Sequence, residues 1–178
     1  GIPVEMPYLP VIESNLTSKA TSVAGAGGLW QIMPSTGKSM GMEINSLVDE
    51  RRDPIKSTHA AAKFMNALYD VFKDWNLVIA AYNCGPGNVN KAIYRAGGKR
   101  DFWSIYPFLP KETRAYLPLY IAAVYSMNFA AYHGISAKED PLFVVDSVPA
   151  DSVLFPELAN LTTSEIVPTD TIVTNQRI

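Results

Sequence analysis

The chain has 178 residues, enough for one main domain with room for a small appendage. It is 48% hydrophobic and 18% charged, so it can bury a sizeable core and is not disordered as a whole. A net charge of −2 and the absence of Lys or Arg runs disfavour nucleic acid and anionic membranes as partners, and no apolar stretch reaches the ~20 residues that span a bilayer.

The N-terminal part of the chain predicts short, irregular elements. An irregular helix is expected over residues 4–14, because two prolines interrupt it. Residues 15–33 hold three glycines among small polar residues, which predicts an irregular loop or small flap that packs back onto this helix. Pro34 then opens a second short helix, which we expect to end at Gly37 or Gly41.

Two longer helices are predicted next. Asp53 followed by Pro54 is typical of a helix start, with Asp as the cap and Pro in the first turn. Apolar residues then recur at helical spacing to about Lys73. Asn76 is expected to open the following helix, which is apolar almost continuously and should therefore be buried nearly all round.

The C-terminal half of the main domain continues this pattern. The Gly-Pro-Gly sequence at residues 85–87 predicts a turn, after which a further helix should run to about Gly97. The aromatic and proline-rich residues 101–110 predict a loop. Residues 111–132 predict the last strong helix, which Pro118 should kink or divide into two pieces.

The composition changes after about residue 137. Short β-branched runs alternate with Asp, Ser, Thr and Pro, and no helical period remains. We therefore expect a domain over residues 1–137, mainly α, and a short irregular or β-rich tail over residues 138–178. The tail is interpreted as a linker or as part of a small accessory module.

Metal and cofactor chemistry has no support in the sequence. Cys84 is the only cysteine, so no intramolecular disulfide can form, and its Gly- and Pro-rich surroundings suggest a small packed residue. His59 and His133 have no metal-ligand spacing with each other or with Cys84. We expect no metal and no cofactor.

Glu13 is the most informative residue of the chain. It ends the apolar, proline-containing run of residues 4–12 and precedes the glycine-rich segment. A carboxyl group held against apolar side chains resists ionisation, and a protonated carboxyl near neutral pH can protonate a leaving-group oxygen. Glu13 is therefore a candidate acid catalyst. The alternative interpretation is a solvated or capping glutamate at a helix end.

Four short motifs follow one another along residues 1–133. They are Glu13-Ser14; Ser22 with Gly25-Ala26-Gly27-Gly28-Leu29-Trp30-Gln31-Ile32-Met33-Pro34; Ala81-Tyr82-Asn83-Cys84-Gly85-Pro86-Gly87; and Leu109-Pro110-Lys111-Glu112-Thr113-Arg114-Ala115-Tyr116. Each is weak alone, but in this order the four closely resemble the SLT-type lytic transglycosylase domain, particularly its membrane-bound D branch. No LysM wall-binding module is recognisable in the tail.

The resemblance implies a fold, a reaction and a location. The fold is a lysozyme-like helical domain with a small flap. The reaction cleaves the β-1,4 bond between N-acetylmuramic acid and N-acetylglucosamine in peptidoglycan glycan strands and leaves a 1,6-anhydromuramoyl end, without a cofactor. We expect a monomer in the cell envelope or periplasm, with an export signal upstream of Gly1.

The resemblance also assigns roles to seven residues. Glu13 is the acid that later acts as the base, and six residues are expected to contact substrate: Ser22, Gln31, Met33, Tyr82, Asn83 and Tyr116. Each of the six has a purely structural alternative, such as a loop serine, a buried glutamine or a tyrosine half in the core. Three tryptophans could also stack on sugars, namely Trp30, Trp75 and Trp103, with core packing favoured for Trp75.

Two rival functions remain open. One is a goose-type-like lysozyme, a hydrolase on the same fold, for which a second carboxylate would be needed. Four acidic residues are available for that role, but each is interpreted as a loop charge or a helix cap: Glu43, Asp49, Glu50 and Asp53. Glu112 and Thr113 are assigned to the start of the last helix. The other rival is an inactive cell-wall-binding protein, which would have no need of a buried acid.

Overall fold

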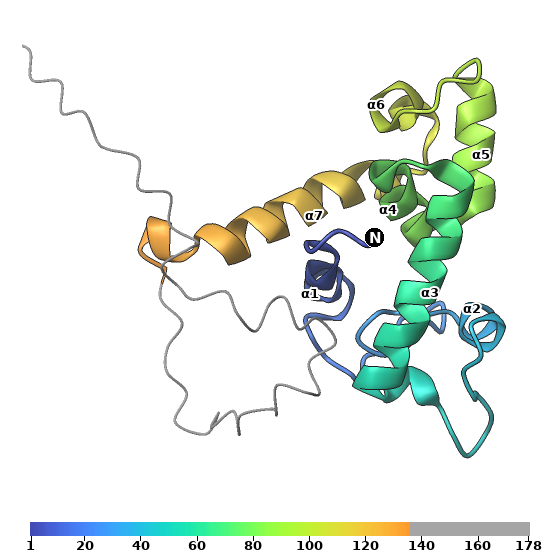
Figure 1. Cartoon of the computed structure of the whole chain (residues 1–178), viewed down its shortest axis with the longest axis vertical. Coiled ribbons are helices and arrows are strands. Elements are labelled where there is room, and N and C mark those ends of the chain that lie inside the picture. The colour runs from blue at the N-terminus through green and yellow to red at the C-terminus, as the bar shows by residue number, and fades with distance from the viewer. Residues whose placement is uncertain (136–178) are drawn as a thin grey trace, which may run out of the picture. The chain divides into compact units, whose positions relative to one another are not determined.

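Helices make up the described part of the chain, residues 1–135, in the computed structural model (Figure 1). In chain order they are η1 (Met6–Tyr8), α1 (Leu9–Ser14), α2 (Pro34–Ser39), η2 (Glu50–Arg52), α3 (Pro54–Phe72), α4 (Trp75–Cys84), α5 (Pro86–Arg95), α6 (Phe102–Ile105), η3 (Tyr106–Phe108), α7 (Lys111–Phe129) and η4 (Ala131–His133). Residues 1–135 contain isolated β-bridges but no strand, so the mainly α prediction is confirmed. The predicted boundary at residue 137 and the predicted tail lie outside the described residues.

Aspartate caps begin several of the helices. Asp53 accepts hydrogen bonds from the backbone nitrogens of Ile55 and Lys56, as its position before a proline predicted. The predicted start of α4 at Asn76 is wrong by one residue, because Asp74 is the cap and accepts from Leu77 N at 3.0 Å. Such caps satisfy backbone donors that have no partner within the helix.

The predicted loop over residues 101–110 is also wrong in part. It contains α6 and η3, because Asp101 caps a short turn by accepting from Ser104 N at 2.9 Å. Phe102 and Ile105 are fully buried, so tertiary packing stabilises a turn that is too short to show a helical period.

Prolines explain the remaining differences at the helix boundaries. The helix predicted over residues 4–14 is divided into η1 and α1, and a proline lies in the first turn of each. Pro86 opens α5 rather than belonging to a turn, since a proline at the first helical position loses no hydrogen bond. Pro118 lies inside α7 without dividing it, although the α-helix ends at Phe129 and a 3₁₀ turn completes the predicted span.

The core is organised around α4. This helix packs against α3, α5 and α7, and α1 lies against α7 (Figure 1). Five consecutive residues, 77–81, are buried, as a helix surrounded on all sides requires. The packing brings the end of α1, the end of α4 and the first turns of α7 to one region, although they are far apart in sequence.

The predicted flap folds around one buried cation, Arg51. The guanidinium Nη1 donates to the carbonyl oxygens of Gly25 at 2.8 Å and Ile32 at 2.9 Å. Its Nε and Nη2 donate to the two carboxylate oxygens of Asp49, each at 2.8 Å. At Gly28, where φ is +80°, a Cβ would lie 1.7 Å from the Arg51 carbonyl oxygen, so only glycine fits. The flap is therefore tied to the segment that precedes α3.

Candidate active site

Glu13 lies at the end of α1, and its carboxylate accepts a hydrogen bond from the hydroxyl of Tyr116 on α7. Burial raises the pKa of Glu13 from 4.5 to about 6. The hydrogen bond from Tyr116 opposes this rise, and the nearby charge of Glu112 adds to it. A carboxyl group with a pKa of about 6 exchanges a proton readily near neutral pH, which is what an acid–base catalyst requires.

All seven predicted site residues line one cleft of about 620 Å³. The cleft is formed by α1, the flap, the end of α4 and one face of α7, and the seven are Glu13, Ser22, Gln31, Met33, Tyr82, Asn83 and Tyr116. An adjoining pocket of about 440 Å³ shares four of them, namely Gln31, Met33, Tyr82 and Asn83. Because the two pockets share these four residues, they form one continuous groove.

The flap presents its side chains to the cleft in fixed positions. Ser22 Oγ accepts from Ala26 N at 3.0 Å, which leaves the hydroxyl proton available. Gln31 has a left-handed backbone with φ at +45°, and its amide donates to Gly28 O at 2.8 Å. Strained backbone of this kind is common at ligand sites, where surrounding structure maintains it. Met33 is 40% exposed, so it forms part of the cleft wall rather than the core.

The end of α4 is anchored to both neighbouring elements. The Tyr82 hydroxyl donates to Trp30 O at 2.7 Å, and Asn83 Oδ1 accepts from the buried Thr113 hydroxyl at 2.8 Å. Burial raises the pKa of Tyr82 well above its usual value, so this phenol stays protonated. These bonds set the position of the α4 terminus relative to the flap and α7, and hence the shape of the cleft.

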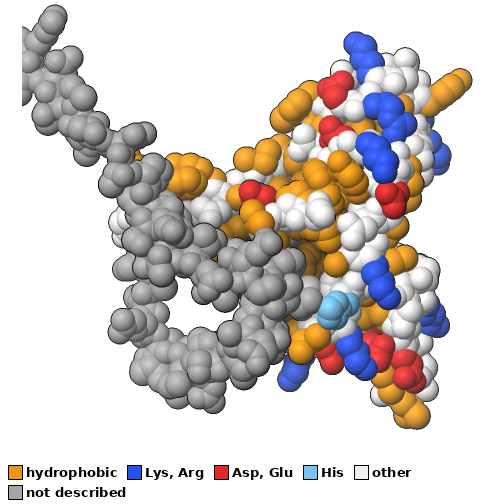
Figure 2. Space-filling view, in the orientation of Figure 1, with side chains coloured by type: hydrophobic (Ala, Val, Ile, Leu, Met, Phe, Trp, Pro, Cys, Tyr) orange, Lys and Arg blue, Asp and Glu red, His pale blue; other side chains and the backbone are white. Residues whose placement is uncertain are grey.

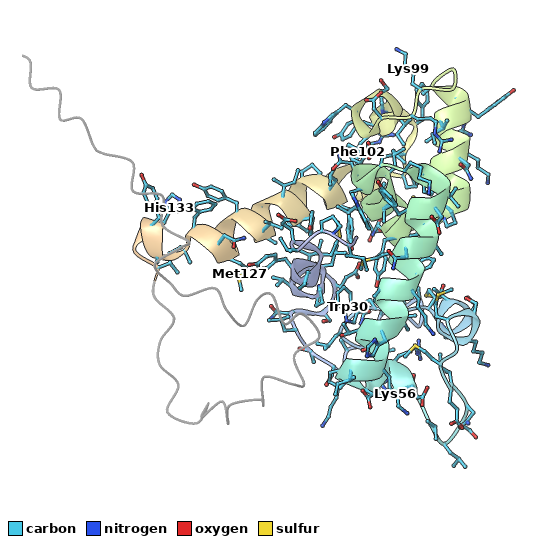
Figure 3. All side chains as sticks on the ribbon, in the orientation of Figure 1. Trp30, Lys56, Lys99, Phe102, Met127 and His133 are labelled. Carbon is cyan, nitrogen blue, oxygen red and sulfur yellow. The ribbon has the colours of Figure 1, made fainter. Side chains whose placement is uncertain are left out.

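The tryptophans do not line the cleft. Trp30 is buried beside α3, where its indole nitrogen donates to Thr58 Oγ1 at 2.8 Å (Figure 3). Trp75 stacks on Tyr69 and packs against the core, as favoured from the sequence. Trp103 is 62% exposed on α6. Cys84 is half-buried in the adjoining pocket, and burial raises the pKa of its thiol.

Acidic residues divide into two groups. The four acidic residues that were candidates for a second carboxylate do not line the cleft. Each makes a local contact instead: Glu43 accepts a hydrogen bond from Asn45, Asp49 pairs with Arg51, Glu50 pairs with Lys56, and Asp53 caps α3. Glu112, assigned from the sequence only to the start of α7, also faces the cleft with Ala115 and Leu119. Glu112, Ala115 and Leu119 are separated by three and then four residues, so they lie on one face of α7. This spacing is visible in the sequence and could have predicted that the three residues face the cleft together.

Among residues 1–135, no three His, Cys, Asp or Glu side chains are grouped as a metal ion would require. In the same part of the chain, no helix combines the length and hydrophobicity needed to cross a bilayer.

The electrostatics of Glu13 can be tested directly. Tyr116→Phe should raise the pKa of Glu13 above 6, because the donated hydrogen bond favours the charged form. Glu112→Gln should lower that pKa, because a like charge is removed. A titration of the Glu13 carboxyl carbon by NMR would measure both. Shifts in the same direction, or none, would contradict the assigned causes.

Comparison with known proteins shows the family to which the chain belongs. Residues 3–104 match the model of the Transglycosylase SLT domain. The chain is 46% identical over 126 residues to membrane-bound lytic murein transglycosylase D of Escherichia coli K12, covering 68% of this chain and 27% of that protein. It is 30% identical over 146 residues to membrane-bound lytic murein transglycosylase F of Cellvibrio japonicus, covering 76% and 26%. The chain therefore spans about a quarter of the length of these relatives.

A solved structure shares the fold. The 70 kDa soluble lytic transglycosylase of Escherichia coli superposes with a TM-score of 0.61 at 25% identity. The match covers 75% of this chain and 22% of that one. The predicted lysozyme-like helical fold is thus shared with a solved lytic transglycosylase.

Proposed function

Because the chain belongs to the transglycosylase SLT domain family, we propose that it is a peptidoglycan lytic transglycosylase. Its reaction would cleave the β-1,4 bond between N-acetylmuramic acid and N-acetylglucosamine and form a 1,6-anhydromuramoyl end. The observation that carries the proposal is Glu13, a largely buried carboxyl with a pKa of about 6, in a cleft with the other six expected site residues.

The proposed mechanism uses Glu13 twice. In the first step the protonated carboxyl donates its proton to the glycosidic oxygen as the bond to muramic C1 breaks. In the second step the carboxylate takes the proton from the C6 hydroxyl, whose oxygen bonds to C1 of the same sugar. The attacking group belongs to the substrate, which supplies a high effective concentration without a bound water. Glu13 ends the cycle protonated, and the substrate acetamido group assists at C1.

Surrounding groups support this proton transfer. The Tyr116 hydroxyl stabilises the carboxylate form by hydrogen bonding, while burial stabilises the protonated form. These opposed effects keep both states accessible in one catalytic cycle. Ser22 and Gln31 on the flap are proposed to bind sugar hydroxyl and acetamido groups, and Met33, Tyr82 and Asn83 to form the cleft wall.

The substrate determines where such an enzyme would work. Peptidoglycan lies outside the cytoplasmic membrane, so we place the activity in the cell envelope or periplasm. Names of the relatives refer to murein and, for two of them, to membrane-bound proteins, which supports this location. The proposed partners are glycan strands, bound by a monomer.

One observation favours an alternative to the transglycosylase reaction, namely hydrolysis of the glycan by a protein with the same fold. Glu112 places a second carboxyl group in the Glu13 cleft, and hydrolytic glycosidases use such pairs. Digestion of purified peptidoglycan, followed by mass analysis of the fragments, separates the possibilities. Anhydro ends support the transglycosylase, reducing muramic acid ends support the hydrolase, and no fragments at all would support a wall-binding protein.

No second acidic residue should be essential. Glu112→Gln should keep cleavage within about tenfold of wild type, because only Glu13 is assigned a proton transfer. Alanine at Glu43, Asp49, Glu50 or Asp53 should reduce activity only by lowering stability. The loss of the Asp53 cap of α3 should cost about 1 kcal/mol. Peptidoglycan cleavage assays that compare all variants at the same concentration of folded protein would measure these effects. A folded variant as inactive as a Glu13 variant would favour the hydrolase.

A further inference from the structure

Four cationic side chains surround a third pocket, of about 460 Å³, beside the first turn of α7. The charges belong to Lys91 and Arg95 on α5 and to Lys111 and Arg114 on α7, and no Asp or Glu lines this basic pocket. Figure 2 shows Lys and Arg side chains in the part of the molecule where Figure 1 labels α5 and α6, with Asp and Glu side chains among them. The chain as a whole carries a net charge of −2, so the cluster is not a result of general basicity.

The fold holds one wall of the basic pocket rigidly. Arg114 Nε donates to Leu109 O at 2.9 Å, and its Nη2 donates to Pro107 O at 2.8 Å. Its guanidinium also lies 5.9 Å from the centre of the Tyr106 ring. Arg114 is thus fixed by the loop that precedes α7. On the other wall, Lys91 and Arg95 are four residues apart and share one face of α5.

Among residues 1–135, the four cations have no acidic partner. None of the ion pairs among residues 1–135 includes any of them. At Pro110, the first backbone donors of α7 have no side-chain cap, which adds partial positive charge at the same place. Like charges that converge without a counter-ion repel one another, and a bound anion removes that repulsion.

The basic pocket lies next to the Glu13 cleft. On α7, Lys111 lines the basic pocket and the next residue, Glu112, lines the cleft. At the start of α5, Pro86 lines the groove that continues the cleft, and Asn88 lines the basic pocket. The groove and the basic pocket therefore share the first turns of α5 and α7.

We propose that the basic pocket binds the carboxylates of peptide side arms on a glycan strand whose sugars lie in the cleft. The proposal rests on the proposed function for the identity of the strand. Peptide arms branch from muramic acid and carry free carboxylates, and Arg114 and the two lysines offer the charge-assisted donors that carboxylates bind best. The pocket would then select strands that bear peptides over bare glycan.

Binding without cleavage tests this directly. The ligand is a disaccharide-peptide with muramic acid at its reducing end, which contains no cleavable bond, and the comparison ligand has its carboxylates converted to amides. For the Lys91→Gln, Lys111→Gln double variant of the full chain, calorimetry should find about tenfold weaker binding of the carboxylate form. Binding of the amide form should be unchanged. Arg114 stays intact because it anchors the loop.

The matched control is the Lys38→Gln, Lys63→Gln double variant, which removes the same charge from exposed lysines that line neither the basic pocket nor the cleft. It should bind like wild type. Equal affinities of wild type and the Lys91, Lys111 variant would overturn the proposal, as would an equal loss in the control. Displacement of the peptide by equimolar inorganic phosphate would assign the pocket to phosphate instead. None of these binding measurements requires cleavage, so their outcome can be interpreted even if the protein does not cleave peptidoglycan.

Discussion

Glu13→Gln is expected to abolish peptidoglycan cleavage while the protein stays folded. The amide cannot donate the proton that the glycosidic oxygen needs, so kcat should fall by at least about 10³-fold, near the upper range for loss of acid–base catalysis. The amide oxygen can still accept the hydrogen bond from Tyr116, which keeps the site intact. Release of soluble fragments from purified peptidoglycan measures the effect.

The same substitution should increase stability at neutral pH. A pKa raised from 4.5 to about 6 means that the protonated form is favoured by folding, so Glu13 costs stability above pH 6 and none below pH 4. This cost is about 2 kcal/mol at pH 7 and above, and glutamine removes it. Denaturant unfolding at pH 5 and pH 8 checks the sign: the gain should appear mainly at pH 8.

Glu112→Gln provides the matched control, since it makes the same chemical change on a neighbouring carboxyl of the same cleft. It should retain cleavage, with a lower pKa for Glu13 and therefore an activity profile displaced to lower pH. Cleavage near the wild-type rate by folded Glu13→Gln would rule out the proposed mechanism.

Arg51→Met is expected to unfold the flap and to cost about 3–5 kcal/mol, the usual loss when one partner of a buried ion pair is removed. The Arg51 side chain is 8% exposed and makes hydrogen bonds to Gly25 O, Ile32 O and both oxygens of Asp49. Methionine leaves the carbonyl oxygens of Gly25 and Ile32 without their donor, and Asp49 keeps only its longer contact with Arg52, at 3.6 Å. Thermal and denaturant unfolding measure the loss.

Arg52→Met is the control, because Arg52 is the adjacent arginine and its side chain is 40% exposed. It donates to Lys19 O and Thr21 Oγ1 at the surface and makes only a long ion pair with Asp49, at 3.6 Å, so its loss should cost about 1 kcal/mol or less. Activity should follow the same order, since the flap carries Ser22 and Gln31 into the cleft. Equal stability losses in the two variants would show that Arg51 has no special role.

The long helices and Glu13 could be identified from the sequence because their signals are local, whereas the other six cleft residues were assigned by the family resemblance. An Asp-Pro pair marks the start of α3, and continuous apolar residues mark α4 as the central helix. Glu13 stood out because a carboxyl at the end of an apolar run is unusual. The resemblance of four ordered motifs then supplied the roles that composition and spacing could not.

Short elements and long-range contacts were decided only by the tertiary structure. The turn of α6 is stabilised by burial of Phe102 and Ile105, which no local period of four residues can reveal. The Tyr116 hydroxyl reaches Glu13 across 103 positions of sequence, and Arg51 reaches Gly25 across 26. Sequence determined that Glu13 could be an acid, whereas the packing of α1 against α7 determined its pKa. That difference arises because residue type sets which proton can move, and burial and neighbouring groups set how easily it moves.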